Sequence, residues 1–163
     1  MDQVRSFPLV IGSAPKVLIL GSAPSPTSLQ AGFYYAHRTN QFWPIICKLF
    51  HADMQMGYEE KYDLLKTKGI ALWDVVDRCI RRGSSDGAIK EVIPHDIPSL
   101  LSAHTSISAI CFNGAAAQHI YHRCHGTPSC RTYRLPSTSS ARAMSVEKKL
   151  QSWSVLLGLI HQP

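Results

Sequence analysis

A repeated pattern, in which a short strand-like segment is followed by a polar turn, constrains the fold of this chain more than any other feature. The segments are Val17 to Leu20, Ile70 to Trp73, Ile107 to Phe112 and Arg131 to Leu135, and helical stretches separate them. Strands that alternate with helices favour a mainly parallel sheet covered on both faces. We therefore expect a three-layer α/β/α fold around a central, mainly parallel, four-stranded sheet.

Periodicity and capping residues predict the helices between these strands. An irregular segment that contains Arg81 to Asp86 is expected before the third of the predicted helices. The predicted helices are Asn40 to Phe50, with Pro44 in its first turn, Tyr58 to Lys66, ended by Gly69, a helix capped by Asp96, Ala115 to Tyr121, and Val146 to Ile160.

Length and composition indicate one domain over residues 1–163, because 163 residues with 45% hydrophobic content can enclose one core. No apolar run approaches the roughly 18 residues of a membrane span, and we see no signal segment. The five cysteines are odd in number and include no Cys-x-x-Cys pair, which suits a reducing compartment. We expect a monomeric, unsecreted protein of the cytoplasm, or of the nucleus in a eukaryote.

The polar turns would lie at one edge of the sheet. They are Gly21 to Ser25, Asp74, Asn113-Gly114 and Pro136 to Ser140, and each directly follows a predicted strand. The carboxyl ends of parallel strands meet at one edge, where open α/β sheets hold their ligands. The four turns therefore predict a single cleft.

The segment from Gly21 to Trp43, GSAPSPTSLQAGFYYAHRTNQFW, carries the groups needed to hold an unstacked base. Three aromatic residues, Phe33 to Tyr35, precede a basic and polar tetrad and the block Asn40 to Trp43. A stacking surface, a cation and an amide thus occur within a short stretch.

The charge distribution is compatible with a polyanionic partner. The chain has 17 Lys and Arg against 11 Asp and Glu, a formal charge of +6. No acidic residue occurs between Asp96 and Glu147, whereas this stretch contains Arg123, Arg131, Arg134 and Arg142. The last third is either a surface that faces a polyanion or a basic surface without a partner.

Taken together, the motifs resemble the uracil-DNA glycosylase superfamily, and within it the sixth family, the hypoxanthine-DNA (deoxyinosine) glycosylases. The resemblance extends from about residue 15 to 155 and implies the same three-layer fold. The motifs that carry it are Gly21-Ser22-x-Pro24-Ser25 with Ser28-Leu29, Gly32-Phe33-Tyr34-Tyr35-x-His37-x-x-Asn40-Gln41-Phe42-Trp43, Ile70-Ala71-Leu72-Trp73-Asp74-Val75, Arg82-Gly83-Ser84-x-Asp86, Phe112-Asn113-Gly114 and Leu135-Pro136-Ser137-Thr138-Ser139.

This resemblance implies a monofunctional glycosylase that flips a deaminated base, hypoxanthine first, out of single- or double-stranded DNA and hydrolyses its N-glycosidic bond. Several sister families carry Asn or Asp where this chain has Ala23, and the resemblance implies that in this family the catalytic residue is instead the Asn of the aromatic block, here Asn40. Tyr35, Asn113, Ser22 and Ala23 would bind the base. The residues expected to contact DNA are Ser25, His37, Arg38, Ser137, Thr138, Ser139, Ser140 and Arg142.

The chain departs from the family pattern at the rim of the expected site. Family members often have Pro and Arg where this chain has Arg38 and Thr39, and Pro where it has Ser140. The residues at the rim of the site would then differ from the family pattern, while those at its catalytic centre are kept.

Each assigned residue also has a purely structural interpretation. Asn40 suits a helix N-cap, and Asn113 suits the turn before Gly114. Phe33, Tyr34 and Tyr35 would fill the layer above the sheet; for Phe33 we prefer this interpretation. The Pro-Ser-Thr-Ser-Ser segment is also ordinary loop composition.

We expect no metal and no cofactor. The cluster His119, His122, Cys124, His125 and Cys130 lacks the paired spacing of a zinc site, and the five cysteines do not match an iron–sulfur branch. No lysine in the motifs offers a Schiff-base nucleophile. Alternatives are a glycosylase for uracil, mismatched thymine or xanthine, an inactive nucleic-acid-binding protein, and a nucleoside hydrolase.

Overall fold

A four-stranded parallel sheet forms the centre of the protein, seen here in a computed structural model that describes residues 2–83 and 85–162. Its strands are β2 (Val17–Gly21), β3 (Ile70–Asp74), β6 (Ala109–Asn113) and β7 (Arg131–Leu135), in the order β3-β2-β6-β7. All three pairings are parallel, as predicted. The four expected strands are confirmed within a few residues at their ends.

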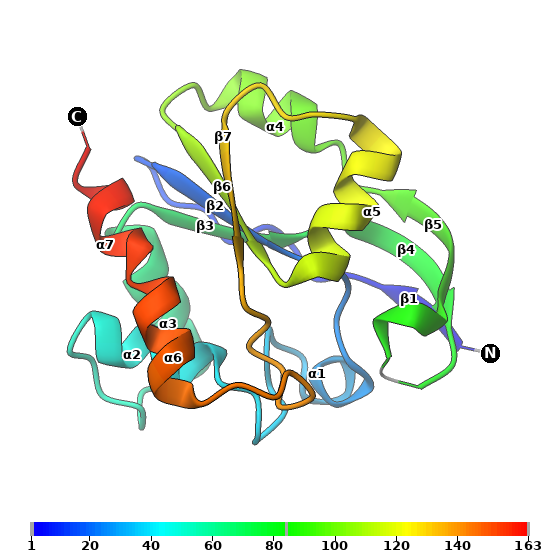
Figure 1. Ribbon diagram of the computed structural model, residues 1–163, viewed down its shortest axis with the longest axis horizontal. Coiled ribbons are helices and arrows are strands. Elements are labelled where there is room, and N and C mark those ends of the chain that lie inside the picture. The colour runs from blue at the N-terminus through cyan, green and yellow to red at the C-terminus, as the bar shows by residue number, and fades with distance from the viewer. Residues whose placement is uncertain (1, 84, 163) are drawn as a thin grey trace.

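Helices cover both faces of this sheet (Figure 1). Strand β2 shows why, because it is buried along its whole length and successive side chains point to opposite faces. Val17 and Ile19 pack in one core cluster, and Leu18 and Leu20 in the other. The first cluster includes residues of α2 (Phe42–Leu49), α6 (Val146–Trp153), α7 (Val155–Ile160) and α3 (Tyr58–Thr67).

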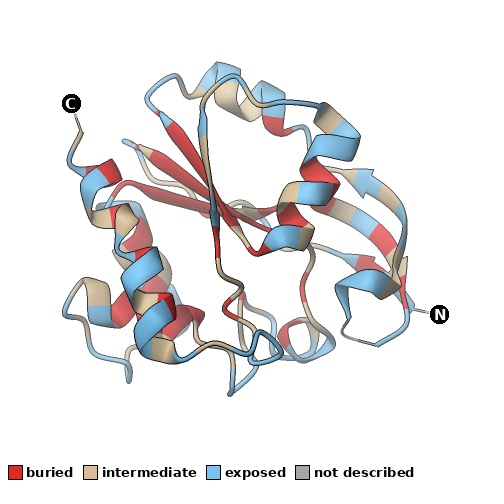
Figure 2. Cartoon of the chain, viewed as in Figure 1, coloured by how far each residue is buried: buried red, intermediate tan, exposed pale blue. Residues whose placement is uncertain are grey.

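The opposite face is covered by α4 (Ile97–Ala103), by α5 (Ala115–His125) and by part of a second sheet. Buried residues are concentrated in the central strands, which lie between the two helical layers (Figure 2). The three-layer α/β/α class is therefore confirmed.

The second sheet is antiparallel and has the order β1-β4-β5. It consists of β1 (Asp2–Arg5), β4 (Val76–Arg81) and β5 (Ile89–Pro94), with the short 3-10 helix η1 (Asp86–Ala88) before β5. Of the predicted irregular segment Arg81 to Asp86, Arg81 ends β4, Arg82 and Gly83 form a bend, and Asp86 begins η1; the strands β4 and β5 on either side of it were not predicted. The predicted segment also includes Ser84, which lies outside the described residues.

The predicted helices are confirmed with three differences. The helix expected from Asn40 begins at Phe42, and the last predicted helix is divided at Ser154 into α6 and α7. The short helix α1 (Pro26–Ala31), which begins after Ser25, was not predicted. Helix α4 has the expected cap, because the Asp96 side chain accepts a hydrogen bond from the Ser99 amide at 3.1 Å.

Candidate active site

A cavity of about 650 Å³ opens at the carboxyl edge of the parallel sheet. Turns that follow β2, β3, β6 and β7 all line it, through residues such as Ser22, Asp74, Asn113 and Ser137. The predicted convergence of the four polar turns is thus observed. Its size lies in the range of small-ligand sites.

Asn40 lies in the cavity wall and is half-buried. Its side-chain Oδ1 accepts a hydrogen bond from the Phe42 amide at 2.9 Å, so the residue holds the start of α2. The next amide, that of Gln41, donates to the carbonyl of Thr138 at 2.9 Å. This bond brings the turn Pro136 to Ser140, called the serine-rich loop below, beside Asn40. Gln41 rather than Asn40 is the N-cap of α2, and an amide oxygen has two lone pairs, so Oδ1 can accept from the Phe42 amide and still accept a hydrogen bond from water.

Tyr35 also lines the cavity, and its ring is held from one side by Phe42. The two rings are stacked with centroids 4.2 Å apart, and Tyr35 has a positive φ of 54°. Its hydroxyl is buried and has no hydrogen-bond partner within the described ranges. Burial, followed by the charge of Asp74, raises the pKa of Tyr35, which keeps the phenol neutral.

The other aromatic residues of this segment have structural contacts. Tyr34 is buried, and its hydroxyl donates to the carbonyl of Pro8 at 2.8 Å. Phe33 stacks on Tyr58 and is not among the residues that line the cavity, which agrees with the structural interpretation preferred for it.

Asn113 and Thr138 are bound to each other by two hydrogen bonds. Asn113 Oδ1 accepts from the Thr138 amide at 2.9 Å, and Asn113 Nδ2 donates to Thr138 Oγ1 at 3.0 Å. Thr138 is fully buried, so the expectation that its hydroxyl contacts DNA is corrected: it anchors the loop. Asn113 acts in the structure as a tie between β6 and this loop, and its role in reading a base stays a prediction.

The close approach of the two turns also requires Gly114. This residue has a φ of 92°, and a Cβ atom on it would lie 3.0 Å from the Cβ of Ser137. A side chain here would be strained and would push the serine-rich loop away.

Most of the serine and threonine hydroxyl groups that were expected to contact the base or DNA already have hydrogen-bond partners in the protein. Ser25 caps α1 by accepting from the Ser28 amide at 3.1 Å, and Ser22 donates to Asp86 at 2.5 Å. Ser137 accepts from the Ser139 amide at 3.2 Å. A phosphate would have to meet the outer faces of these turns, and their contact with DNA stays a prediction.

The exposed rim carries the remaining predicted DNA contacts. His37, Ser140 and Arg142 are exposed and line the mouth of the cavity, whereas Arg38 is exposed but outside its lining. The hydroxyl groups of Thr39 and Ser140 lie 3.0 Å apart and join the two segments of the rim.

Two residues of α6 bind the serine-rich loop through its main-chain carbonyls, and neither was expected to act in the site. The Trp153 indole N–H donates to the Pro136 carbonyl at 2.9 Å, and the Lys149 ammonium donates to the Ser139 carbonyl at 2.9 Å. Both side chains are fully buried. Burial lowers the pKa of Lys149, with a further contribution from Arg142.

Three charged residues, Asp74, Arg81 and Asp86, also line the cavity. Asp74 was expected at this edge of the sheet, but none of the three was predicted to act in the site. Arg81 is 2% exposed and donates from Nη2 to the carbonyl of Pro24. Asp74 is 3% exposed, and its Oδ2 has no hydrogen-bond partner in the parts of the chain that are described. Burial, then the charge of Asp86, raises the pKa of Asp74 to about 7, against the opposing effect of Arg81. A carboxylate directly after a buried apolar strand is the sequence signal that identifies it.

The described residues contain neither a candidate metal cluster nor a membrane-spanning helix. No three His, Cys, Asp or Glu side chains of residues 2–83 and 85–162 lie together as candidate metal ligands. Over the same residues, no helix combines the length and the apolar character needed to cross a bilayer.

Known proteins resemble this chain over almost its whole length. The profile of the Uracil DNA glycosylase superfamily matches residues 9–157. A protein named hypoxanthine DNA glycosylase from Methanosarcina acetivorans is 33% identical over 93% of this chain and 96% of its own length. Its namesake from Methanosarcina barkeri is 29% identical over 92% and 95%. A solution NMR structure, described as a uracil DNA glycosylase from Methanosarcina acetivorans, superposes with a TM-score of 0.78 at 31% identity and covers 96% of this chain and 99% of its own.

Proposed function

The chain belongs to the uracil DNA glycosylase superfamily, and from this premise we propose that it is a DNA repair glycosylase for deaminated bases, with hypoxanthine as its main substrate. It extrudes the base from DNA and hydrolyses the N-glycosidic bond, which leaves an abasic site. The observation that carries the proposal is the cavity in which Asn40, Tyr35 and the serine-rich turns meet, in a chain with two relatives named hypoxanthine DNA glycosylase.

The cavity supplies the groups that this reaction needs. As the bond from C1′ to the base nitrogen lengthens, its electron pair passes to the base and the sugar gains positive character. A water molecule forms the new bond to C1′ and loses a proton to solvent. Asn40 accepts a hydrogen bond from this water and fixes its position; as an amide it takes no proton.

Tyr35 contributes a flat wall for the extruded base. Its ring is fixed by Phe42 on one side, and it lines the cavity in which the base would lie. Stacking on a fixed aromatic ring contributes about 1–3 kcal/mol per base in related complexes.

The position of the cavity fits a nucleic-acid substrate. Serine-rich turns and the exposed Arg142 surround its mouth, and groups of this kind contact phosphates in protein–DNA complexes. A free nucleoside would make no use of these rim groups.

Duplexes that contain deoxyinosine, deoxyuridine or deoxyxanthosine, followed by alkaline cleavage of abasic sites, test the proposal. We expect deoxyinosine to be processed fastest, and Asn40→Ala to reduce the single-turnover rate by 100-fold or more. Because Ala also removes the hydrogen bond to the Phe42 amide, which costs about 1 kcal/mol, Asn40→Ser is the matched control. Ser can still accept from the Phe42 amide and loses the reach to water, so it should be stable but equally slow.

Two outcomes would count against this proposal. If Asn40→Ser released the base at the wild-type rate, Asn40 would have no role in the reaction. Binding of damaged DNA by the wild-type protein without base release from any of the three duplexes would leave only a DNA-binding protein.

A further inference from the structure

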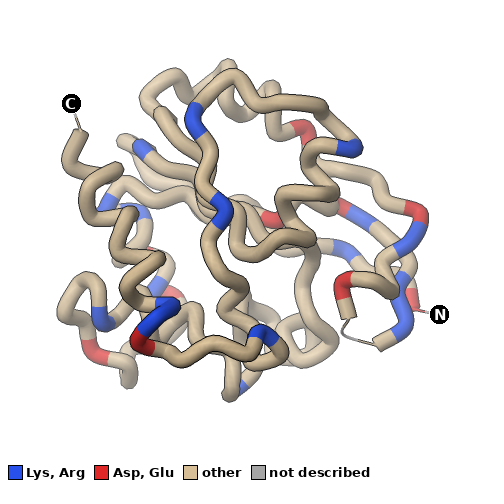
Figure 3. Tube along the Cα trace, viewed as in Figure 1, with Lys and Arg blue, Asp and Glu red and all other residues tan. Residues whose placement is uncertain are grey.

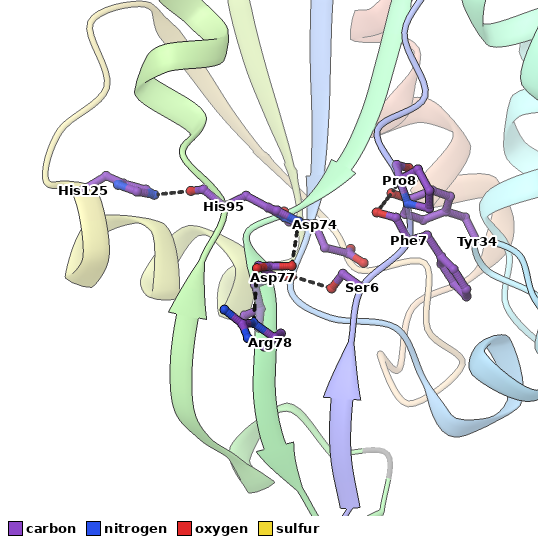
Figure 4. A network of polar contacts seen from close by, with 10 residues as sticks. Ser6, Phe7, Pro8, Tyr34, Asp74, Asp77, Arg78, His95 and His125 are labelled. Carbon is purple, nitrogen blue, oxygen red and sulfur yellow. Dashed lines mark hydrogen bonds and ion pairs between the residues drawn. The ribbon is translucent and has the colours of Figure 1, made fainter.

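Asp74 is a buried acid in the cavity wall that the mechanism above does not use. Its backbone is fixed on two sides: β3 pairs with β2 so that Asp74 lies opposite Gly21, and the Val75 amide donates to the Gly21 carbonyl at 2.8 Å. The ring of His95 binds the Asp74 carbonyl oxygen at 2.8 Å. Figure 4 shows the Asp74 side chain pointing away from this histidine. The carboxyl group is thus held in place by the sheet.

The Asp74 carboxyl group and the Tyr35 hydroxyl pack over the same glycine in the cavity wall. Within the described residues, neither Asp74 Oδ2 nor the Tyr35 hydroxyl has a hydrogen-bond partner, although both are buried. A Cβ atom on Gly21 would lie 2.5 Å from Asp74 Oδ1 and 2.7 Å from the Tyr35 hydroxyl, so both groups pack over this glycine. A buried carboxyl oxygen without a partner is costly, and in a cavity wall it indicates a ligand that binds it.

The surroundings of Asp74 favour its neutral form. Asp86 of η1 repels a negative charge on Asp74, and Arg81 of β4, which donates to the Pro24 carbonyl, attracts one less strongly. Tyr34 and Tyr35 face Asp74 as neutral phenols because their own pKa values are raised by burial. Burial lowers the pKa of His95, whose ring contacts the main chain of Asp74. A base that enters the cavity removes water from the carboxyl group and disfavours its charge further.

We propose that Asp74, as a neutral carboxylic acid, donates a hydrogen bond to the carbonyl oxygen of the extruded base and is a second catalytic residue. The inference rests on the proposed glycosylase function. When the glycosidic bond breaks, the electron pair that the base receives spreads onto its carbonyl oxygen. A neutral acid stabilises this developing charge, whereas a carboxylate would repel it. Asp74 keeps its proton, so the balance of the hydrolysis is unchanged.

The same geometry specifies the class of base. A neutral carboxyl group offers one O–H and one carbonyl oxygen, side by side. This pair matches a carbonyl next to a ring N–H, the edge that deamination creates in hypoxanthine, xanthine and uracil.

Single-turnover base release from a deoxyinosine duplex, measured between pH 5.5 and 9.5, tests this inference. The wild-type rate should fall about tenfold per pH unit above the pKa of Asp74 in the complex, because one proton is needed. Asp74→Asn keeps an N–H donor that does not titrate, so this decline should disappear. Asp74→Ala should lose about 100-fold at pH 6, the usual effect of removing one donor to a developing anion. Asp63→Asn, the same change at an exposed position of α3, should follow the wild type.

Three results would overturn the role of Asp74 while base release by the wild type persists. These are a rate that rises with pH through neutrality, an alkaline decline in Asp74→Asn parallel to that of the wild type, and wild-type rates in Asp74→Ala. Binding to product DNA with an abasic site, measured by anisotropy, should be unchanged in both variants because the product lacks the base. A wild-type protein that releases no base would instead overturn the glycosylase function, and this inference with it.

Discussion

At the scale of single residues, the buried carboxyl group of Asp74 makes the stability of the protein depend on pH. In the folded protein burial raises its pKa from the ordinary 3.8 to about 7. Between these values the unfolded chain releases the proton more readily, so the free energy of unfolding falls as pH rises from 4 to 7 and levels off above 7. One pKa unit corresponds to about 1.4 kcal/mol, so the loss amounts to a few kcal/mol.

Urea unfolding at pH 4, 6 and 8 measures this effect. Asp74→Asn has no titrating group here, so we expect it to match the wild type at pH 4 and to be more stable at pH 8. Asp63→Asn should reproduce the wild-type curve. Equal slopes of stability against pH in Asp74→Asn and the wild type would show that Asp74 is ionised at little cost.

The two asparagine residues of the site show how far single residues can be predicted from sequence. The motif places Asn40 and Asn113 at the correct edge of the sheet, and both line the cavity. The hydrogen-bond partners of these residues could not be predicted in the same way, because Asn113 binds Thr138, which is 25 residues away. Such a pairing depends on how two turns meet in space, which a local pattern does not contain.

At the scale of elements, helix α6 determines the position of the serine-rich loop. The Trp153 side chain fills the core and binds the Pro136 carbonyl, so Trp153→Phe keeps most of the packing and leaves that carbonyl without its donor. We expect a loss of about 1–3 kcal/mol in the free energy of unfolding, together with slower base release because the loop is less fixed.

Trp73→Phe is the matched control for this substitution. The Trp73 indole N–H is buried without a hydrogen-bond partner in the described parts of the chain, so its removal breaks no hydrogen bond. Urea unfolding should therefore show a smaller loss than in Trp153→Phe. Equal losses in the two variants would mean that the bond to Pro136 contributes nothing beyond ring packing.

The elements that could be predicted are those whose pattern reflects burial on both faces. Strands β2 and β6 are almost entirely buried, and their continuous apolar runs identify them. Strand β5 contains no buried residue and mixes apolar and charged residues without a regular alternation, so no local pattern reveals its pairing with β4. The division of the last helix at Ser154 escaped prediction because the apolar spacing continues across it.

At the scale of the whole molecule, basic residues are distributed over many elements. Figure 3 shows Lys and Arg spread along the chain trace without a single dominant cluster. Of the four arginines in the acid-free stretch, Arg142 lines the cavity mouth, whereas Arg131 begins β7 at the opposite edge of the sheet. Arg123 and Arg134 line a second hollow of about 730 Å³. The arginines of the last third thus lie at two neighbouring hollows and at the far edge of the sheet, and a polyanionic partner for this stretch stays a prediction.

This distribution predicts how affinity for DNA depends on salt. Each phosphate contact by a cation releases counterions, so the logarithm of the binding constant falls linearly with the logarithm of salt concentration, with a slope of about −0.9 per contact. Arg142→Gln should reduce this slope by about 1, equally for damaged and undamaged duplexes, because a phosphate contact carries no base information. Arg131→Gln, which removes the same charge at the opposite edge of the sheet, should leave the slope unchanged. Fluorescence anisotropy from 50 to 300 mM salt would measure both, and equal slopes in the two variants would mean that net charge, not the cavity rim, governs the encounter with DNA.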